Sequence, residues 1–184
     1  MKVTNCEIPG LLVIEPRVFE DDRGVFYETF NLKKFKEASG LASVDFYQDN
    51  ESISKKNVLR GLHFQVPPYA QGKLVRVTSG KVLDVAVDIR KGSPTYGQYH
   101  IVELSAENKK IFWIPPGFAH GFVALEDETI FNYKCTDYYH PESERTIQWN
   151  DLDLAIKWGV KTPIISEKDQ KGQVFTTFVS DFQY

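Results

Sequence analysis

The sequence predicts an all-β protein, a twisted barrel of two antiparallel sheets with a few short helices. Between about residues 44 and 135, short alternating or apolar runs are separated by short connections rich in Gly, Pro, Ser or Asn. Aromatic residues make up 14% of the chain, which suits a barrel wide enough to hold one small ligand. The 184 residues are the length of one ordinary domain, and no long linker or repeat divides them. We therefore expect a single domain over residues 1–184, with the functional site at the mouth of the barrel.

The apolar runs predict eight strands. Alternation with a period of two is typical of a strand that buries one face, and a short apolar run suits a strand buried on both. In chain order the expected strands are residues 44–50, 58–65, 73–78, 81–89, 98–104, 110–114, 120–125 and 129–135. After Trp149 the strand pattern is lost, and we expect loops there, with a last strand at 174–179.

Two short helices are expected. The first spans residues 32–39, with Asn31 as its N-cap, Gly40 just past its end, and Phe30 and Phe35 placed to pack as a hydrophobic staple. The second is a single helical turn within SEKDQKG, capped by Ser166.

Composition argues against several partners and locations. The formal net charge of −3 provides no overall basic field, so we expect no nucleic-acid partner, and an anionic ligand must be met by local arginines and lysines. Residues 1–16 lack the pattern of a signal peptide, and no segment is apolar enough to span a bilayer. Cys6 and Cys135 share no metal-type spacing, and we expect two reduced thiols. The sequence therefore predicts a cytoplasmic protein without a membrane partner.

The stretch LRGLHFQ, residues 59–65, places a histidine and an arginine in one expected strand. In a regular strand Arg60 and His63 would point to opposite faces. A bulge at Gly61 would insert one residue and let both side chains enter the same cavity. Without the bulge, His63 would be a core histidine bonded to backbone and Arg60 would lie in solvent. The sequence leaves both interpretations open.

The segment IPPGFAHGF resembles the second motif of the cupin barrels through Pro115, Gly117 and His120. The first cupin motif normally supplies a His-x-His pair and a glutamate to a metal, but the matching strand here offers only His63. A metal site needs at least three well-placed ligands. We therefore expect a cupin-like jelly-roll barrel without a metal, which would act by acid–base chemistry or by binding alone.

A longer series of motifs is similar to the dTDP-4-dehydrorhamnose 3,5-epimerase family and covers most of residues 15–170. In chain order the motifs are RVFEDDRGVFYETF, FYQDNESISKKNVLRGLHFQ, QGKLVRVTSGKVLDVAVDIRKGSPTYGQ, LSAENKKIFWIPPGFAHGF, YKCTDYYHPESE and WND. The resemblance implies a homodimer of cupin-like subunits with no metal or organic cofactor. It also implies the substrate dTDP-4-dehydro-6-deoxy-D-glucose and a place in the pathway to dTDP-L-rhamnose.

The resemblance implies four catalytic residues. The C4 ketone of such a substrate acidifies the hydrogens on C3 and C5, so His63 would be the general base, paired with Asp169 of the SEKD segment. Tyr133 would return a proton to the opposite face, and Lys73 would stabilise the enolate oxygen. Taken without the resemblance, Asp169 could equally serve the start of a helix, and Tyr133 could be a core tyrosine.

The other family positions would bind the sugar and the nucleotide, and Tyr139 would stack on the thymine base. They are Arg23, Glu28, Gln48, Asn50, Arg60, His120, Tyr139, Glu144 and Lys168. Arginine suits a diphosphate because its planar guanidinium donates two parallel hydrogen bonds. Arg23 and Glu28 could instead form an exposed ion pair around Gly24. Gln48 and Asn50 lie on one face of the expected strand, which favours shared use.

Three alternatives remain open at the level of sequence. A sister enzyme on the same scaffold would epimerise only C3 or only C5, or isomerise the keto sugar, since the catalytic set does not determine how many centres are inverted. A metal-dependent cupin oxygenase is disfavoured by the missing His-x-His pair. A sugar-nucleotide binder without catalysis would keep the arginines and Tyr139 but tolerate the loss of His63.

Overall fold

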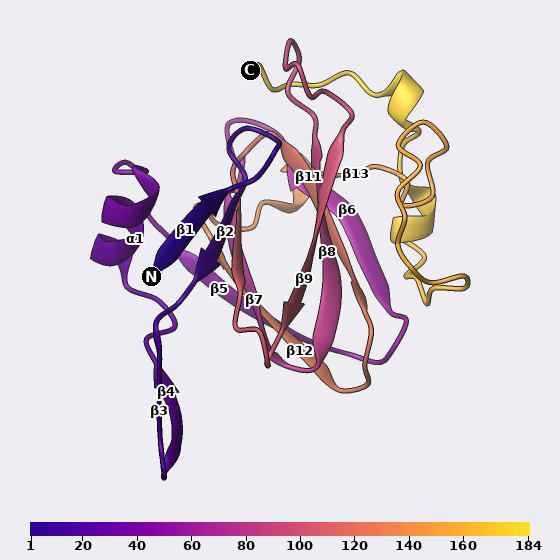
Figure 1. Ribbon diagram of the computed structural model, residues 1–184. Helices are drawn as coiled ribbons and strands as arrows, with labels where there is room; N and C mark the ends of the chain where they lie inside the picture. The colour runs from indigo at the N-terminus through magenta and orange to yellow at the C-terminus, as the bar shows by residue number, and fades with distance from the viewer.

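The computed structural model describes residues 1–184 and contains two main antiparallel sheets (Figure 1). The six-stranded sheet has the order β1 (Lys2–Asn5), β2 (Leu12–Glu15), β10 (Ile111–Ile114), β7 (Lys73–Ser79), β12 (Thr129–Cys135) and β5 (Gln48–Ser54). The five-stranded sheet has the order β13 (Glu144–Thr146), β6 (Leu59–Gln65), β11 (Phe118–Ala124), β8 (Lys81–Asp88) and β9 (Tyr99–Ser105). A separate hairpin joins β3 (Val18–Asp21) to β4 (Gly24–Tyr27). The all-β barrel of two antiparallel sheets is confirmed.

The central core lies between the two sheets. The six-stranded sheet contributes Val75 and Phe131 from neighbouring strands, and the five-stranded sheet contributes Val82 and Ala86 from alternate positions of β8. All four residues are almost completely buried. Because side chains alternate along a strand, residues of opposite parity on β8 face the outside of the barrel and need separate cover.

The C-terminal segment provides this cover. Leu154, Trp158 and Phe182 pack against the outward side chains Val85 and Val87 of β8 in a second buried cluster. In Figure 1 the orange and yellow part of the chain runs along the side of the five-stranded sheet. The same segment contains η2 (Asp169–Lys171), so this packing fixes where Asp169 lies.

All eight expected strands are present, but the first was placed too early. The structure puts β5 at 48–54 and not at 44–50. Phe46 belongs to an aromatic cluster with Phe30, Phe35 and Trp113, with ring centroids 5.3 to 5.9 Å from that of Phe46. Phe46 therefore packs against the aromatic side chains on and beside helix α1 (Leu32–Ser39) and does not pair in a strand. Five short strands, β1 to β4 and β13, were not predicted.

The expected strand at 174–179 is wrong. This region contains η3 (Phe175–Thr177), a 3-10 turn, and residues 174–179 form no strand. The Phe175 backbone N–H donates to the Asp151 carboxylate, and the Phe178 ring packs edge-on against Phe64 at 5.5 Å. Side-chain anchoring therefore replaces a sheet ladder here.

Both expected helices are confirmed. Helix α1 (Leu32–Ser39) begins after Asn31, whose side-chain oxygen accepts a hydrogen bond from the Lys34 N–H, and it ends at Gly40 with a φ of 75°. The expected turn within SEKDQKG is the 3-10 turn η2, and just before it the Ser166 hydroxyl accepts a hydrogen bond from the Asp169 N–H at 3.1 Å. The remaining short turn is η1 (Pro141–Ser143). No helix in the structure has both the length and the apolar character needed to cross a membrane.

The bulge that the sequence allowed at Gly61 is present. On β11, His120 pairs with His63 and Phe122 pairs with Arg60, so two steps along β11 match three steps along β6. Gly61 has a φ of +130°, and a Cβ atom there would lie 2.5 Å from the Gly121 Cα. Only glycine avoids both the unfavourable backbone conformation and this contact. The extra residue changes the face to which the side chains on either side of it point.

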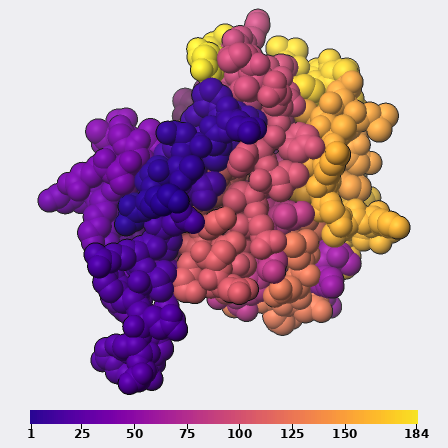
Figure 2. Space-filling view, viewed as in Figure 1, coloured from indigo at the N-terminus to yellow at the C-terminus, as the bar shows by residue number.

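The β3–β4 hairpin stands clear of the barrel. Figure 2 shows it as a narrow projection at the indigo end of the chain. It exposes apolar surface, with Phe26 71% and Phe19 50% accessible. Exposed aromatic side chains clustered on a projecting element are typical of a contact surface.

Candidate active site

One cavity of about 280 Å³ contains the four residues predicted to be catalytic. His63 comes from β6, Lys73 from β7, Tyr133 from β12 and Asp169 from η2. Arg60, His120 and Lys168 line the same cavity. Residues more than 100 positions apart in the sequence thus surround one space inside the barrel, which we call the reaction cavity.

His63 and Asp169 form a short hydrogen bond. The His63 Nε2 and Asp169 Oδ1 atoms lie 2.6 Å apart, and the other carboxylate oxygen of Asp169 accepts from the Gly61 N–H at 3.2 Å. Burial alone would raise the pKa of the Asp169 carboxyl, but the hydrogen bond and charge of His63 outweigh it and lower the pKa below its ordinary value. A buried, ionised carboxylate therefore holds one ring nitrogen of His63.

The bulge brings Arg60 to the same cavity as His63, as the sequence allowed. The Arg60 Nε donates to the Ser54 hydroxyl at 3.3 Å, which holds the guanidinium stem against β5. Both side chains line the reaction cavity. The alternative without a bulge is therefore wrong, although the Arg60 side chain is exposed where it lines the cavity.

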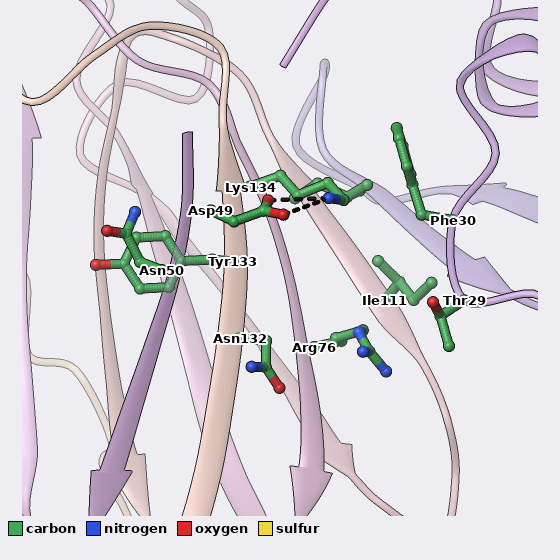
Figure 3. Close-up of a pocket in the computed structure, with 10 residues that line it drawn as sticks. Thr29, Phe30, Asp49, Asn50, Arg76, Ile111, Asn132, Tyr133 and Lys134 are labelled. Carbon is green, nitrogen blue, oxygen red and sulfur yellow. Dashed lines mark hydrogen bonds and ion pairs between the residues drawn. The ribbon is translucent and has the colours of Figure 1, made fainter. Parts of the chain in front are cut away.

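Lys73 and Tyr133 lie close together on neighbouring strands. The Lys73 Nζ is 6.0 Å from the centre of the Tyr133 ring. Burial lowers the pKa of Lys73 and raises the pKa of Tyr133, because both charged forms lose water. Tyr133 therefore keeps its proton at neutral pH. In Figure 3 its side chain lies beside Asn50 and away from the Lys134–Asp49 ion pair of the same sheet.

The structure contains a second His–Asp pair, of which the sequence predicted His120 but not Asp84. The His120 Nε2 lies 3.0 Å from each carboxylate oxygen of Asp84, and Asp84 is completely buried. Burial lowers the pKa of His120, although the Asp84 charge and hydrogen bond oppose this shift. A sequence signal for Asp84 existed: it shares parity with Val82 and Ala86 on β8, so an aspartate stands where the alternation requires a core residue.

The mouth of the cavity gathers more of the predicted binding residues. An adjoining cavity of about 350 Å³ shares His63, Lys73 and Tyr133 with the reaction cavity. It is also lined by Gln48, Asn50, Tyr139 and Glu144.

Hydrogen bonds connect these mouth residues. The Tyr139 hydroxyl donates to Glu144 at 2.7 Å, and the Lys168 ammonium donates to the same carboxylate. Gln48 donates to Asn50 at 2.9 Å and accepts from the Tyr139 N–H at 2.8 Å. We call the adjoining cavity that these residues line the mouth.

Arg23 and Glu28 do not join the other predicted residues in this chain. Arg23 lies at the tip of the β3–β4 hairpin and donates to Asp21 at 2.6 Å. Glu28 pairs with Lys34 at 3.1 Å. The exposed ion pair between Arg23 and Glu28 is therefore also wrong, since each has a different partner. No group of three or more His, Cys, Asp or Glu side chains is arranged to hold a metal ion.

The fold and the cavity define a class of protein, a cupin-like barrel whose interior is equipped for proton transfer. A sequence model of the family dTDP-4-dehydrorhamnose 3,5-epimerase matches residues 5–177. The chain is 56% identical over 175 residues to the dTDP-4-dehydrorhamnose 3,5-epimerase of Shigella flexneri, covering 95% of this chain and 96% of the relative. This chain therefore belongs to the dTDP-4-dehydrorhamnose 3,5-epimerase family.

Solved structures agree with this assignment. The structure of dTDP-6-deoxy-D-glucose-3,5-epimerase RmlC from Legionella pneumophila, in complex with dTDP-4-keto-L-rhamnose, superimposes with a TM-score of 0.94 at 49% identity, covering 100% of this chain and 98% of that chain. A more distant match is ChmJ, a 3'-monoepimerase from Streptomyces bikiniensis, in complex with dTDP-quinovose. Its TM-score is 0.87 at 32% identity, with 94% of this chain and 87% of that chain covered.

Proposed function

We infer that this protein is a dTDP-4-dehydrorhamnose 3,5-epimerase. It acts on dTDP-4-dehydro-6-deoxy-D-glucose and inverts C3 and C5 to give dTDP-4-dehydro-L-rhamnose in dTDP-L-rhamnose biosynthesis. The observation that carries this conclusion is the single cavity that contains the His63–Asp169 pair, Lys73 and Tyr133. An epimerisation next to a ketone needs a base, a stabiliser of the enolate oxygen and an acid on the other face, and these side chains provide all three.

His63 is the proposed base. Its Nε2 is held by Asp169, so Nδ1 is the nitrogen available to take the proton from C3 or C5. The Asp169 carboxylate stabilises the imidazolium that forms and keeps the ring in one orientation. A base positioned in this way accelerates proton transfer by ~10²- to 10⁴-fold.

Lys73 is the proposed partner of the enolate oxygen. When carbon loses its proton, negative charge moves to the oxygen on C4, and an ammonium group stabilises it most strongly where water is excluded. Burial lowers the pKa of Lys73. The developing oxyanion opposes this shift, so the attraction is greatest when the charge appears.

Tyr133 is the proposed acid. Inversion requires that the new proton arrive on the face opposite the one from which His63 removed the first. Burial raises the pKa of Tyr133, so the phenol is neutral and holds a proton to donate to the enolate carbon. Without it, a single base would return the proton to the face from which it came.

The binding residues extend from the reaction cavity to the mouth. We propose that Arg60 and Lys168 meet the diphosphate, that Tyr139 stacks on the thymine base, and that His120 hydrogen-bonds the sugar. Gln48, Asn50 and Glu144, which line the mouth, bind polar groups of the nucleotide and sugar. The Glu144 carboxylate already holds Tyr139 and Lys168, which orients both before the ligand arrives.

We also propose that the protein is a homodimer in which the β3–β4 hairpin reaches the partner's mouth. The hairpin exposes Phe19 and Phe26 and carries Arg23, which lies outside this chain's own cavities. Light scattering of wild type and of Phe26→Asp, which gives the molecular mass in solution, tests this proposal. Wild type should have the mass of two chains and the variant that of one. A monomeric wild type would disprove the proposal.

Deuterium exchange tests the proposed reaction. With the 4-keto sugar nucleotide in D₂O, the protein should exchange hydrogen for deuterium at both C3 and C5, as observed by proton NMR. The second candidate function is that of a sister enzyme that inverts one centre. The similarity of this chain to ChmJ, a 3'-monoepimerase, supports this candidate. Exchange at one carbon alone would establish that candidate, and no exchange at either carbon would leave only a sugar-nucleotide binder.

A further inference from the structure

Strand β5 contributes a side chain to the reaction cavity that the proposed chemistry does not use, that of Ser52. Residues Gln48, Asn50, Ser52 and Ser54 alternate along β5 and therefore share one face. On the neighbouring strand β12, Ser52 is paired with Phe131, next to the pair of Asn50 with Tyr133. Ser52 thus lies in the middle of a polar row that borders the proposed acid.

The Ser52 hydroxyl is the unsatisfied member of this row. Gln48 and Asn50 hydrogen-bond each other, and the Ser54 hydroxyl accepts from Arg60. The Ser52 Oγ is buried and has no hydrogen-bond partner in the protein. A buried hydroxyl without a partner is unfavourable, and such groups in folded proteins call for a specific explanation.

We propose that Ser52 is a further substrate-binding residue, whose hydroxyl bonds a hydroxyl group on the sugar ring of the bound nucleotide. This assignment rests on the proposed function. No hydrogen bond within the protein restrains the Ser52 side chain, so turning its hydroxyl toward a ligand breaks no existing hydrogen bond. The new bond would satisfy a group that is otherwise unpaired.

The position of Ser52 favours the sugar over the base, and its chemistry favours the sugar over the phosphates. Ser52 lines the reaction cavity with His63, Lys73 and Tyr133, whereas Tyr139 and Glu144 line the mouth. The ring that carries C3 and C5 must lie where the base and acid lie. Hydroxyl groups both donate and accept, so a serine matches a sugar hydroxyl, whereas phosphate oxygens are best met by cations such as Arg60.

Binding measurements test the assignment without requiring turnover. Calorimetry gives the Kd of dTDP, of dTDP-6-deoxy-D-glucose, which lacks the ketone, and of its 2-deoxy and 3-deoxy analogues. Ser52→Ala should leave the Kd for dTDP unchanged and weaken dTDP-6-deoxy-D-glucose by about 3- to 10-fold, the range for one lost neutral hydrogen bond. The analogue that lacks the contacted hydroxyl should bind wild type and Ser52→Ala equally. Ile53→Val, on the outer face of the same strand, is the matched control and should bind all four ligands as wild type does.

Two outcomes would overturn the proposal. Equal weakening of dTDP and of the sugar nucleotides would mean that Ser52 supports the strand and not the ligand. An unchanged Kd for every sugar nucleotide would mean that the hydroxyl makes no contact. Failure of the proposed function is a separate result, because it would appear as absence of exchange by wild type in D₂O.

Discussion

The barrel contains two His–Asp pairs whose histidines face each other across β6 and β11, yet the two pairs differ in access to the cavity. His63 and Asp169 are 2.6 Å apart, and the His63 side chain is 26% exposed. His120 and Asp84 are 3.0 Å apart, and the His120 side chain is 8% exposed. Both histidines line the reaction cavity, but His63 is more open to it and His120 is more deeply buried in its wall.

This difference assigns different tasks to the two pairs. His63 can reach a substrate carbon while Asp169 holds the far side of its ring. Burial lowers the pKa of His120, so the His120 ring is neutral at neutral pH. A neutral ring that is locked by Asp84 suits hydrogen bonding to the substrate, whereas a proton-transferring ring must be free to change its charge.

Replacing each histidine should separate the two tasks, and this is the largest effect we expect. His63→Asn should lower the rate of deuterium exchange by at least ~10²-fold, because the base is removed. His120→Asn should lower it by about 10-fold, the effect of one hydrogen bond to the substrate. Exchange is measured by proton NMR with the 4-keto sugar nucleotide in D₂O.

Calorimetry with dTDP is the control for both variants. His63→Asn and His120→Asn should bind dTDP as wild type does, because the proposed contacts to the thymine base and the diphosphate come from Tyr139, Arg60 and Lys168 and not from either histidine. If His120→Asn abolished exchange while His63→Asn retained it, the roles of the two pairs would be reversed.

The pH dependence of stability should sharpen the comparison with a smaller effect. The pKa of His120 is below its ordinary value of 6.5, so the unfolded chain binds this proton more readily than the folded protein. The free energy of unfolding should therefore fall as the pH drops below 6.5, by up to about 1.4 kcal/mol per pH unit for one group. The pKa of Asp169 is below its ordinary value of 3.8, so its contribution is lost only as the pH falls below 3.8.

Urea unfolding between pH 7 and pH 3 gives the free energy of unfolding in both pH ranges, below 6.5 for His120 and below 3.8 for Asp169. His120→Gln should flatten the profile just below pH 6.5, and Asp169→Asn should flatten it only at the acid end. A profile for His120→Gln with the wild-type slope between pH 6.5 and 5 would show that His120 is not the group responsible.

Local sequence patterns predicted much of the fold. Alternation and turn residues located the strands from 58 to 135, since each depends on a period of two and on Gly or Pro in the connections. Asn31, Gly40 and Ser166 marked helix ends because capping is a contact within four residues. The strand at 44–50 was displaced because Phe46 packs in an aromatic cluster formed by distant segments.

The site also contains residues that the sequence identified and residues that only the structure revealed. The sequence singled out His63, Tyr133 and Lys73 by residue type and by resemblance, and the folded chain brings them into one cavity. Asp84 was overlooked although its parity with Val82 and Ala86 marked it, whereas Ser52 has no distinctive local pattern. Their importance depends on what stands on the neighbouring strand.

By itself the sequence determined the all-β architecture and the residue types available for acid–base chemistry, because these follow from periodicity and side-chain chemistry. It allowed a bulge at Gly61, and the structure decided that the bulge forms. The resemblance implied that Asp169 pairs with His63, but only the tertiary structure revealed that Asp84 pairs with His120 and how each pair is brought together. Asp169 reaches His63 from 106 positions away because the C-terminal segment packs on the outer face of the five-stranded sheet. Burial then differs between the two pairs, and burial is a property of the assembled sheets that no short stretch of chain contains.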